Sequence, residues 1–240
     1  MKKIKNILIT GGSRGIGREL VKFFAKKKFN VFYTYKKNSN LKQINNPYSN
    51  IYPIKCNMEN QSNIKKLIKI IKNKKLKLNI LINNAGDVFQ RSKFSNSSDE
   101  LWRKSINLNL LSSVYLTKGL LPQIVKSKHS VIINISSISA RIGGGGDSMH
   151  YGVAKAGLNA FTIGLAKELK NIRVIGIAPS IIDTDFQRKH STKKRISKII
   201  KQTPLGRIGN VEDVRNLVDF LVSNRSSYLS GEIIYLSGGR

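Results

Sequence analysis

A tyrosine and a lysine four residues apart, Tyr151 and Lys155, are the residues of this chain whose types and spacing point most directly to chemistry. Four residues is just over one helical turn, so both side chains project from the same face of a helix. An ammonium beside a phenol favours the phenolate, which lowers the pKa of a tyrosine from its usual value of about 10. The pair predicts an acid–base device, although Tyr-x-x-x-Lys also occurs on helix faces that only meet solvent.

A glycine-rich turn near the start of the chain, Thr10-Gly11-Gly12-Ser13-Arg14-Gly15-Ile16-Gly17, adds weight to that prediction. It follows the apolar stretch Ile7-Leu8-Ile9, typical of a buried parallel strand, and precedes apolar residues at helical spacing. Glycines at such a strand-to-helix turn permit a tight bend and a close approach to a pyrophosphate, whose charge the helix N-terminus attracts. The turn predicts a dinucleotide-binding loop.

Small polar residues follow two further strand-like stretches. Asn83-Asn84-Ala85-Gly86 follows Ile80-Leu81-Ile82, and Ser136 and Ser137 follow the apolar residues 131–135. In open parallel sheets, ligands bind outside the carboxyl ends of the strands. We therefore expect these polar residues to gather around one ligand.

As a set, these motifs resemble the short-chain dehydrogenase/reductase family, from the first strand to Ser237-Gly238-Gly239. The resemblance implies a Rossmann-like, doubly wound parallel α/β sheet, with residues 1–240 forming a single domain. It also implies an enzyme that interconverts a ketone and a secondary alcohol by hydride transfer with a nicotinamide cofactor. The expected cofactor-binding residues are Gly11, Ser13, Arg14, Gly15, Ile16, Gly17, Lys36, Asn57, Asn84, Ala85, Gly86, Tyr151, Lys155 and Thr184.

The same resemblance assigns four catalytic residues. Tyr151 exchanges a proton with the substrate oxygen, Lys155 holds the tyrosine pKa down and binds the nicotinamide ribose, and Ser137 hydrogen-bonds the substrate oxygen. The main-chain carbonyl of Asn109 holds a relay water. Two neighbours compete for these roles, Ser136 for that of Ser137 and Asn107 for that of Asn109. We expect His150 and His190 to pack or hydrogen-bond, and no metal site.

The choice of cofactor can also be predicted. An acidic residue after the second strand usually binds the ribose 2′-OH of NAD. Here that strand runs from Val31 into Lys36 and Lys37 with no Asp or Glu. Arg14 and Lys36 could together bind a 2′-phosphate, so NADP(H) is favoured over NAD(H).

Three departures from the family pattern concern the same site. Ser180 stands in Ala178-Pro179-Ser180 where the family usually has Gly, and Asn57 replaces the usual Asp after the third strand. Ser137 and Tyr151 are one residue further apart than usual, with Gly143-Gly144-Gly145-Gly146 between them. A glycine loop can absorb that residue, and it borders the substrate pocket.

The elements that must position these residues alternate along the chain. Strands are expected near residues 5–10, 30–35, 51–55, 79–83, 130–136, 172–178 and 232–236. Helices are expected between them, one of them with the apolar stripe Ile64, Leu67, Ile68 and Ile71. Such alternation predicts a parallel sheet with helices on both faces. The longest less regular stretch is predicted near residues 179–210, which contain Pro179 and Pro204, and in this family that region is a mobile substrate lid.

The formal net charge of +30 raises the question of nucleic-acid or membrane binding. Lys, Ile and Asn, all with AT-rich codons, make up 86 of the 240 residues, so codon bias explains the composition without a nucleic-acid partner. No apolar run approaches the roughly 20 residues of a membrane span. Cys56 is the only cysteine, so a reducing cytoplasmic setting fits.

Substrate and partners are the least determined by the sequence. The segment Thr203–Arg207, the Ser230-Gly231-Glu232 ending and a basic patch at Lys126–Lys128 favour a carrier-linked 3-oxoacyl substrate. The glycine run and Asp183-Thr184-Asp185-Phe186 favour a sugar, polyol or other small hydroxy compound instead. A non-catalytic basic binding protein on the same fold is a third alternative, which the intact catalytic residues oppose. The resemblance also implies a homo-oligomer, a dimer or tetramer.

Overall fold

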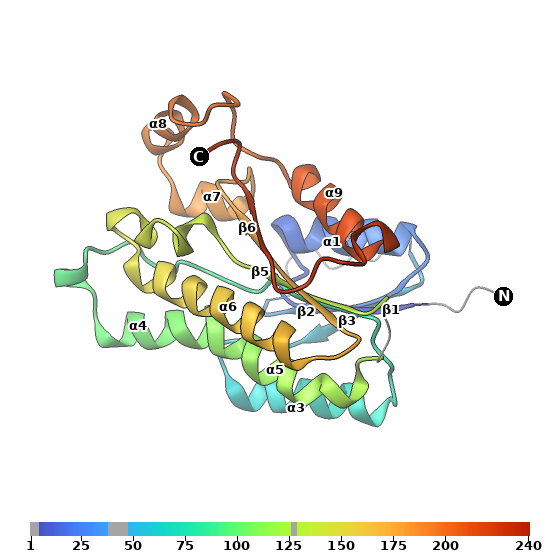
Figure 1. Ribbon diagram of the computed structural model, residues 1–240. Helices are drawn as coiled ribbons and strands as arrows, with labels where there is room; N and C mark the ends of the chain where they lie inside the picture. Colours follow the sequence, from blue (N-terminus) through green and yellow to red (C-terminus); the bar gives the residue numbers. More distant parts are fainter. Residues whose placement is uncertain (1–4, 38–47, 126–128) are drawn as a thin grey trace.

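Seven short stretches rich in β-branched and aromatic residues form strands, as their propensities favour. The computed structural model describes residues 5–37, 48–125 and 129–240, apart from the side chains of residues 188 and 189 (Figure 1). Its strands are β1 (Asn6–Ile9), β2 (Asn30–Tyr35), β3 (Ile51–Lys55), β4 (Ile80–Asn83), β5 (Val131–Ile135), β6 (Arg173–Pro179) and β7 (Ile233–Leu236). Each strand lies within about a residue of its predicted range, because each is a compact apolar run.

The strands form one sheet in the order β3-β2-β1-β4-β5-β6-β7, and every pair is parallel. In β1, Leu8 pairs with Phe32 of β2 on one side and Leu81 of β4 on the other. The chain order reverses at this point, between β1 and β4. In a doubly wound sheet, the reversal leaves a crevice at the carboxyl ends of the strands where ligands bind.

Helices cover both faces of the sheet, which confirms the predicted fold class. Ile7 and Ile9 point into a core shared with α1 (Gly15–Lys26) and α9 (Val211–Val222). Leu8, one residue out of phase, points into the opposite core with α3 (Gln61–Asn73) and α5 (Ser112–Leu120). Figure 1 shows α1 and α9 on one side of the sheet, and α3, α5 and α6 (Met149–Glu168) on the other. Each large apolar side chain buried in these cores contributes about 1.5–3 kcal/mol.

Side-chain caps define where several of these helices begin. The Asn60 side chain accepts hydrogen bonds from the backbone N–H groups of Ser62 and Asn63 at the start of α3. Ser98 caps α4 (Asp99–Ile106) in the same way. After α4 the helix continues through a π-helical turn, residues 107–111, directly into α5. One long helix with a locally widened turn thus crosses the sheet.

The prediction of a less regular stretch near residues 179–210 is wrong in part. This segment contains α7 (Asp185–His190) and α8 (Lys193–Lys201). Thr192 caps α8 by accepting a hydrogen bond from the backbone N–H of Arg195, and Ile199 anchors the helix as a buried residue. Pro179 and Pro204 flank the two helices and do not interrupt them. Within the described residues, no helix is both long and apolar enough to span a membrane.

Candidate active site

A cavity of about 800 Å³ lies at the carboxyl ends of the central strands. All but one of the residues predicted to bind cofactor or catalyse the reaction line it, including Gly11, Lys36, Asn57, Thr184 and Tyr151. The exception is Asn109, which is buried behind the wall. Such a volume is typical of a small-molecule site. Residues from distant parts of the chain thus meet around one space.

The glycine-rich loop fits closely against its surroundings. A Cβ on Gly17 would lie 2.2 Å from the carbonyl oxygen of Gly11, so α1 can approach the loop only if residue 17 is glycine. Gly11 has a φ of +66°, a conformation that favours glycine. The Thr10 hydroxyl accepts hydrogen bonds from the N–H groups of Asn84 and Ala85, at 2.9 and 3.0 Å. The loop after β1 and the loop after β4 are thereby held together.

The N-terminus of α1 is suited to an anionic ligand. Arg14, the N-cap residue, makes no side-chain cap, and the first turn of α1 contains no acidic residue. Positive charge from the helix dipole is therefore uncompensated within the helix, beside the cavity wall formed by Ser13, Gly15 and Ile16. These residues fit the pyrophosphate of a nicotinamide cofactor.

Tyr151 lies on the first turn of α6, and its hydroxyl is hydrogen-bonded to Ser137. Ser137 is the second residue after β5 and stands in the cavity wall. The Ser136 hydroxyl points elsewhere and donates to the carbonyl oxygen of Lys155 at 3.2 Å. The geometry therefore favours Ser137 over Ser136 as the partner of the tyrosine.

The tyrosine pKa differs from our expectation. We expected Lys155 to lower it, but burial of the phenol raises the pKa of Tyr151 to about 12. The hydrogen bond with Ser137 opposes this rise, the charge of Asp87 adds to it, and the charge of Arg91 opposes it. Desolvation outweighs the two opposing effects because it penalises the charged phenolate directly. In this environment the phenol is held protonated, the form that can donate a proton to a carbonyl oxygen.

Lys155 is itself buried, with an exposed fraction of 2%. Its ammonium donates to the carbonyl oxygen of Ile135 at 2.8 Å and lies 5.6 Å from the centre of the Tyr151 ring. Burial lowers the pKa of Lys155 to about 7. The lysine can therefore change its charge near neutral pH, beside the tyrosine.

Asn109 lies in the π-helical turn, where the backbone departs from the regular helix. Its side-chain nitrogen donates to the carbonyl oxygen of Asp87 at 2.9 Å, and its side-chain oxygen accepts from the N–H of Asp87 at 3.1 Å. A Cβ on Gly86 would meet this asparagine at 2.9 Å and the Lys155 ammonium at 3.3 Å. Asn107 is exposed instead. Of the two asparagines, Asn109 therefore lies near Lys155, and Asn107 faces away.

Two ion pairs at the cofactor end of the cavity could not be predicted from spacing. Arg14 pairs with Asp87 at 3.3 Å, and Lys36 pairs with Glu59 at 2.6 Å. No acidic residue follows β2 in the chain, but Glu59, which follows β3, lies beside the end of β2. The two cations predicted to bind a phosphate therefore each have a carboxylate partner.

The two histidines of the site make specific contacts, as expected. The His150 ring is buried, meets the carbonyl oxygen of Gln90 at 3.1 Å, and packs edge-on against Trp102. Burial lowers the pKa of His150. His190 at the end of α7 lies 2.7 Å from a carboxylate oxygen of Asp87. Among the described residues, no group of three potential ligands could hold a metal ion.

The departures from the family pattern are accommodated locally. All four glycines of the 143–146 loop have positive φ, which makes room for the extra residue between Ser137 and Tyr151. Asn57 accepts a hydrogen bond from the N–H of Glu59 at 3.2 Å, as an aspartate could. Ser180 lines the cavity, and its N–H pairs with the carbonyl oxygen of Leu236.

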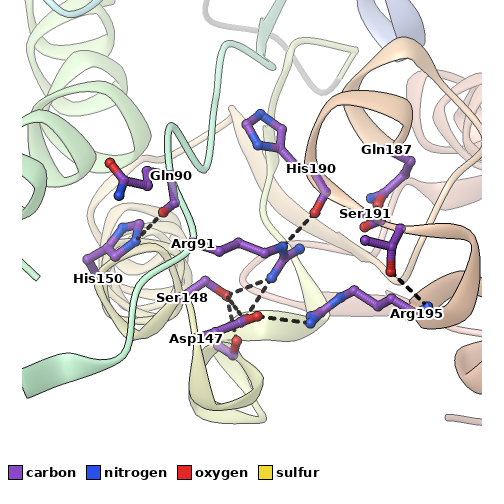
Figure 2. A network of polar contacts seen from close by, with 11 residues as sticks. Gln90, Arg91, Asp147, Ser148, His150, Gln187, His190, Ser191 and Arg195 are labelled. Carbon is purple, nitrogen blue, oxygen red and sulfur yellow. Dashed lines mark hydrogen bonds and ion pairs between the residues drawn. The ribbon is translucent and has the colours of Figure 1, made fainter. Parts of the chain in front are cut away.

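A network of charged groups at the other end of the cavity was missed by sequence reasoning. Arg91 and Arg195 both bind the carboxylate of Asp147, at 2.8 and 3.1 Å (Figure 2). Arg91 also donates to the main-chain oxygen of His190 at 2.6 Å. The three charged residues come from the loop after β4, the loop before α6 and α8, so their meeting depends on the tertiary fold. No motif of short spacing signals it.

Comparisons with known proteins agree with this architecture. A family model described as Enoyl-(Acyl carrier protein) reductase matches residues 11–240. The 3-oxoacyl-(acyl-carrier-protein) reductase FabG of Escherichia coli K12 is 33% identical over 238 residues, 98% of this chain and 96% of that protein. The FabG protein of Aquifex aeolicus is 34% identical over 239 residues, 97% of this chain and 95% of its own.

Solved structures give the same result. A short-chain dehydrogenase/reductase from Brucella melitensis, titled glucose/ribitol dehydrogenase, superimposes with a TM-score of 0.90 at 28% identity, covering 98% of this chain and 96% of that chain. A 4-hydroxyisoleucine dehydrogenase mutant complexed with NADH and succinate also has a TM-score of 0.90, at 27% identity, covering 98% of both chains.

Proposed function

The chain belongs to the short-chain dehydrogenase/reductase family, enzymes that act on CH–OH or carbonyl groups with a nicotinamide cofactor, and from that premise we propose an NADP(H)-dependent ketone reductase. The observation that carries this proposal is the hydrogen bond between Tyr151 and Ser137 beside the buried Lys155, in a wall of the cavity that begins at the glycine loop. The reaction is reversible, so the same site oxidises a secondary alcohol.

The proposed mechanism divides the work among three side chains. The glycine loop would hold the pyrophosphate of a nicotinamide cofactor, which when bound would supply or accept the hydride. Ser137 hydrogen-bonds the substrate oxygen, which gains negative charge during reduction, and Tyr151 donates its proton to that oxygen. Lys155 has a pKa of about 7, so it can be charged or neutral near neutral pH, and its charged form would stabilise the tyrosinate left after proton transfer. We also assign to Lys155 the binding of the cofactor ribose. As in our prediction, the main-chain carbonyl of Asn109 offers an acceptor to a relay water.

The preference for NADP(H) is supported by Arg14 and Lys36, which both line the cavity. Their carboxylate partners bear on that preference in different ways. Asp87 pairs with Arg14 and also contacts His190. A 2′-phosphate would therefore compete with Asp87 for Arg14, and Asp87 would keep its contact with His190. Glu59 is the only described acidic partner of Lys36, and it would repel a 2′-phosphate while it accepts from a ribose 2′-OH.

Substitutions of Arg14, Lys36 and Glu59 test this cofactor assignment. The wild type should bind NADPH more tightly than NADH, and Arg14→Gln with Lys36→Gln should weaken NADPH binding by about 1.5–3 kcal/mol per lost charged hydrogen bond. Glu59→Gln should strengthen NADPH binding and leave NADH binding unchanged or weaker, because a like charge is removed. Fluorescence titration measures the affinities of the three proteins for both cofactors, with the exposed Lys66→Gln as control. Equal wild-type affinity for both cofactors would refute the preference.

The substrate that the relatives favour is a carrier-linked 3-oxoacyl thioester. The relatives are named for that substrate, and identity near 33% extends over almost the whole chain. Steady-state oxidation of NADPH with 3-oxoacyl thioesters and with keto-sugars tests the assignment. The proposal fails if no ketone in the panel is reduced.

A carrier protein would add a charge effect. Lys126→Glu with Lys128→Glu should raise KM for a carrier-linked substrate several-fold and leave a small thioester mimic unaffected, because rim charges act mainly on encounter. These two lysines lie outside the described residues, so the prediction rests on the sequence. High salt should reproduce the effect on the wild type, since screening limits charge effects to about 8 Å near physiological ionic strength. Indifference to both changes would remove the carrier from the proposal.

A second candidate substrate is a small hydroxy or keto compound. It is favoured by the charged wall that Arg91 and Arg195 form near Tyr151, which offers little to a hydrocarbon chain. The names of the structural relatives, glucose/ribitol dehydrogenase and 4-hydroxyisoleucine dehydrogenase, also indicate small hydroxy compounds.

We also propose that the protein self-associates as a dimer or tetramer. Met149 and Val153 are spaced one turn apart on α6, and 41% and 48% of their surfaces are exposed. An apolar pair of this kind on the helix that carries Tyr151 is suited to contact with a second copy.

A further inference from the structure

Four cationic side chains line the end of the cavity away from the glycine loop. They are Arg91 from the loop after β4, Arg195 and Lys198 from α8, and Arg240. Within the described part of the chain, the acidic partner of this group is Asp147, which binds both Arg91 and Arg195 (Figure 2). Taken together, Asp147 and the four cations carry a formal charge of +3.

The cationic group also contains a hydrogen-bond donor without an acceptor in the part of the protein that the structure describes. The Nε–H of Arg195 is buried and finds no acceptor among the described residues. An unsatisfied buried donor on a charged group is costly, so such groups need an explanation beyond stability. The Arg240 guanidinium lies close enough to Arg195 that their repulsion, added to burial, lowers the pKa of Arg240. Both features would be relieved by a bound oxyanion.

The cationic group lies next to the proposed catalytic residues. A guanidinium nitrogen of Arg91 lies 3.4 Å from the Ser148 hydroxyl. Ser148 precedes Tyr151 by one turn, and its carbonyl oxygen accepts the N–H of Tyr151 at 3.1 Å. One helical turn is about 5.4 Å long. If one substrate places its anionic group here and its carbonyl group at Tyr151, only a few bonds can separate the two groups.

We propose that the substrate is a small ketone or secondary alcohol that carries an oxyanion, a carboxylate or a phosphate ester, and that Arg195 with Arg91 binds this group. The inference rests on the proposed reductase function and narrows its substrate class. Arg195 presents a planar fork of donors that matches either oxyanion, and Asp147 holds it in place before substrate binds. Lys198 and Arg240 add long-range attraction.

Matched pairs of substrates test the proposal by activity. We would compare 4-oxopentanoate with its methyl ester, and dihydroxyacetone phosphate with dihydroxyacetone, in NADPH oxidation assays. At least one anionic member should have a kcat/KM about tenfold or more above its neutral partner, and the pair that does so identifies carboxylate or phosphate. Arg195→Gln should reduce that ratio at least tenfold, while Arg195→Lys should keep part of it. Lys201→Gln, an exposed substitution on the same helix, is the control and should change nothing.

A binding measurement separates this proposal from the reductase function. Succinate and inorganic phosphate would be titrated calorimetrically into the wild type and Arg195→Gln, both saturated with NADP⁺. At least one anion should bind the wild type and lose tenfold or more affinity in the variant. Two results would contradict the anion site and still be consistent with the reductase function. One is reduction of ketones with no preference for the anionic members, and the other is binding of both anions with the same affinity in the wild type and in Arg195→Gln. If an anion binds less tightly to Arg195→Gln than to the wild type but no ketone is reduced, the anion site is supported and the reductase function is contradicted.

Discussion

Replacing Tyr151 by phenylalanine should lower kcat by about 10²–10⁴-fold, the usual contribution of a positioned general acid. The substitution removes only the hydroxyl, which is hydrogen-bonded to Ser137. The ring and its packing on α6 stay, so the affinity for NADPH should be nearly unchanged. Single-turnover kinetics and fluorescence titration measure the two quantities separately. Tyr228→Phe, which alters a fully exposed tyrosine, is the matched control.

The outcome also bears on which group supplies the proton. A Tyr151→Phe protein that kept more than a few per cent of wild-type activity would exclude the tyrosine as the acid. Ser137→Ala should lower kcat as well, because it removes the proposed hydrogen bond to the substrate oxygen, together with the hydrogen bond to Tyr151. If Ser137→Ala were silent, the substrate oxygen would have to lie elsewhere in the cavity.

Replacing Lys155 by methionine should damage both turnover and cofactor binding and yet stabilise the fold at neutral and lower pH. The folded-state pKa of Lys155 is about 7, below its usual value of 10.5. The unfolded chain therefore binds more protons between these values, and wild-type stability rises with pH there. The stability cost of burying the charged lysine is absent above pH 10.5, grows as the pH falls, and is fully present below about pH 7.

The pKa shift sets an upper limit of about 5 kcal/mol on the gain in unfolding free energy at pH 6. Loss of the hydrogen bond to Ile135 would offset about 1–3 kcal/mol of that gain. The gain should shrink by about 1.4 kcal/mol per pH unit between pH 7 and 10. Urea unfolding at pH 6, 7.5 and 9 measures this, with Lys66→Met on the exposed face of α3 as control. A pH-independent difference would contradict a buried lysine that titrates near neutrality.

The fold was predictable because its signals are local. The runs Ile7–Ile9, Ile80–Ile82 and 131–135 are too short and too apolar to be anything but buried strands between helices. Ile64, Leu67 and Ile71 are buried on one face of α3, as their spacing predicts. Residues 179–210 were harder, because α7 and α8 are short and polar and depend on a cap and one buried isoleucine.

In the candidate site too, the residues that belong to local motifs were predictable, and the contacts between distant segments were not. Residues carried by a motif, such as Tyr151 and Gly17, line the cavity as predicted. The Lys36–Glu59 pair and the Arg91–Asp147–Arg195 cluster join segments that are far apart in the chain, so spacing carries no trace of them. The direction of the Tyr151 pKa shift was missed for a related reason: motif reasoning counts the neighbouring charge, but it does not measure burial.

The π-helical turn at residues 107–111 has a consequence for length variation. In an α-helix each residue advances the side chains by about 100° around the axis, so one inserted or deleted residue changes which face meets the core. Here α4 packs Leu101 inward before the turn, and α5 packs Leu116 and Leu120 inward after it. The widened turn reconciles the two faces. A π-helical turn takes up one residue more than an α-helical turn without rotating the helix on either side of it. A single-residue deletion within it would therefore restore a regular helix and keep the packing faces of α4 and α5, but it would remove the widening at Asn109, so the cost of such a deletion should fall on the site and not on the core.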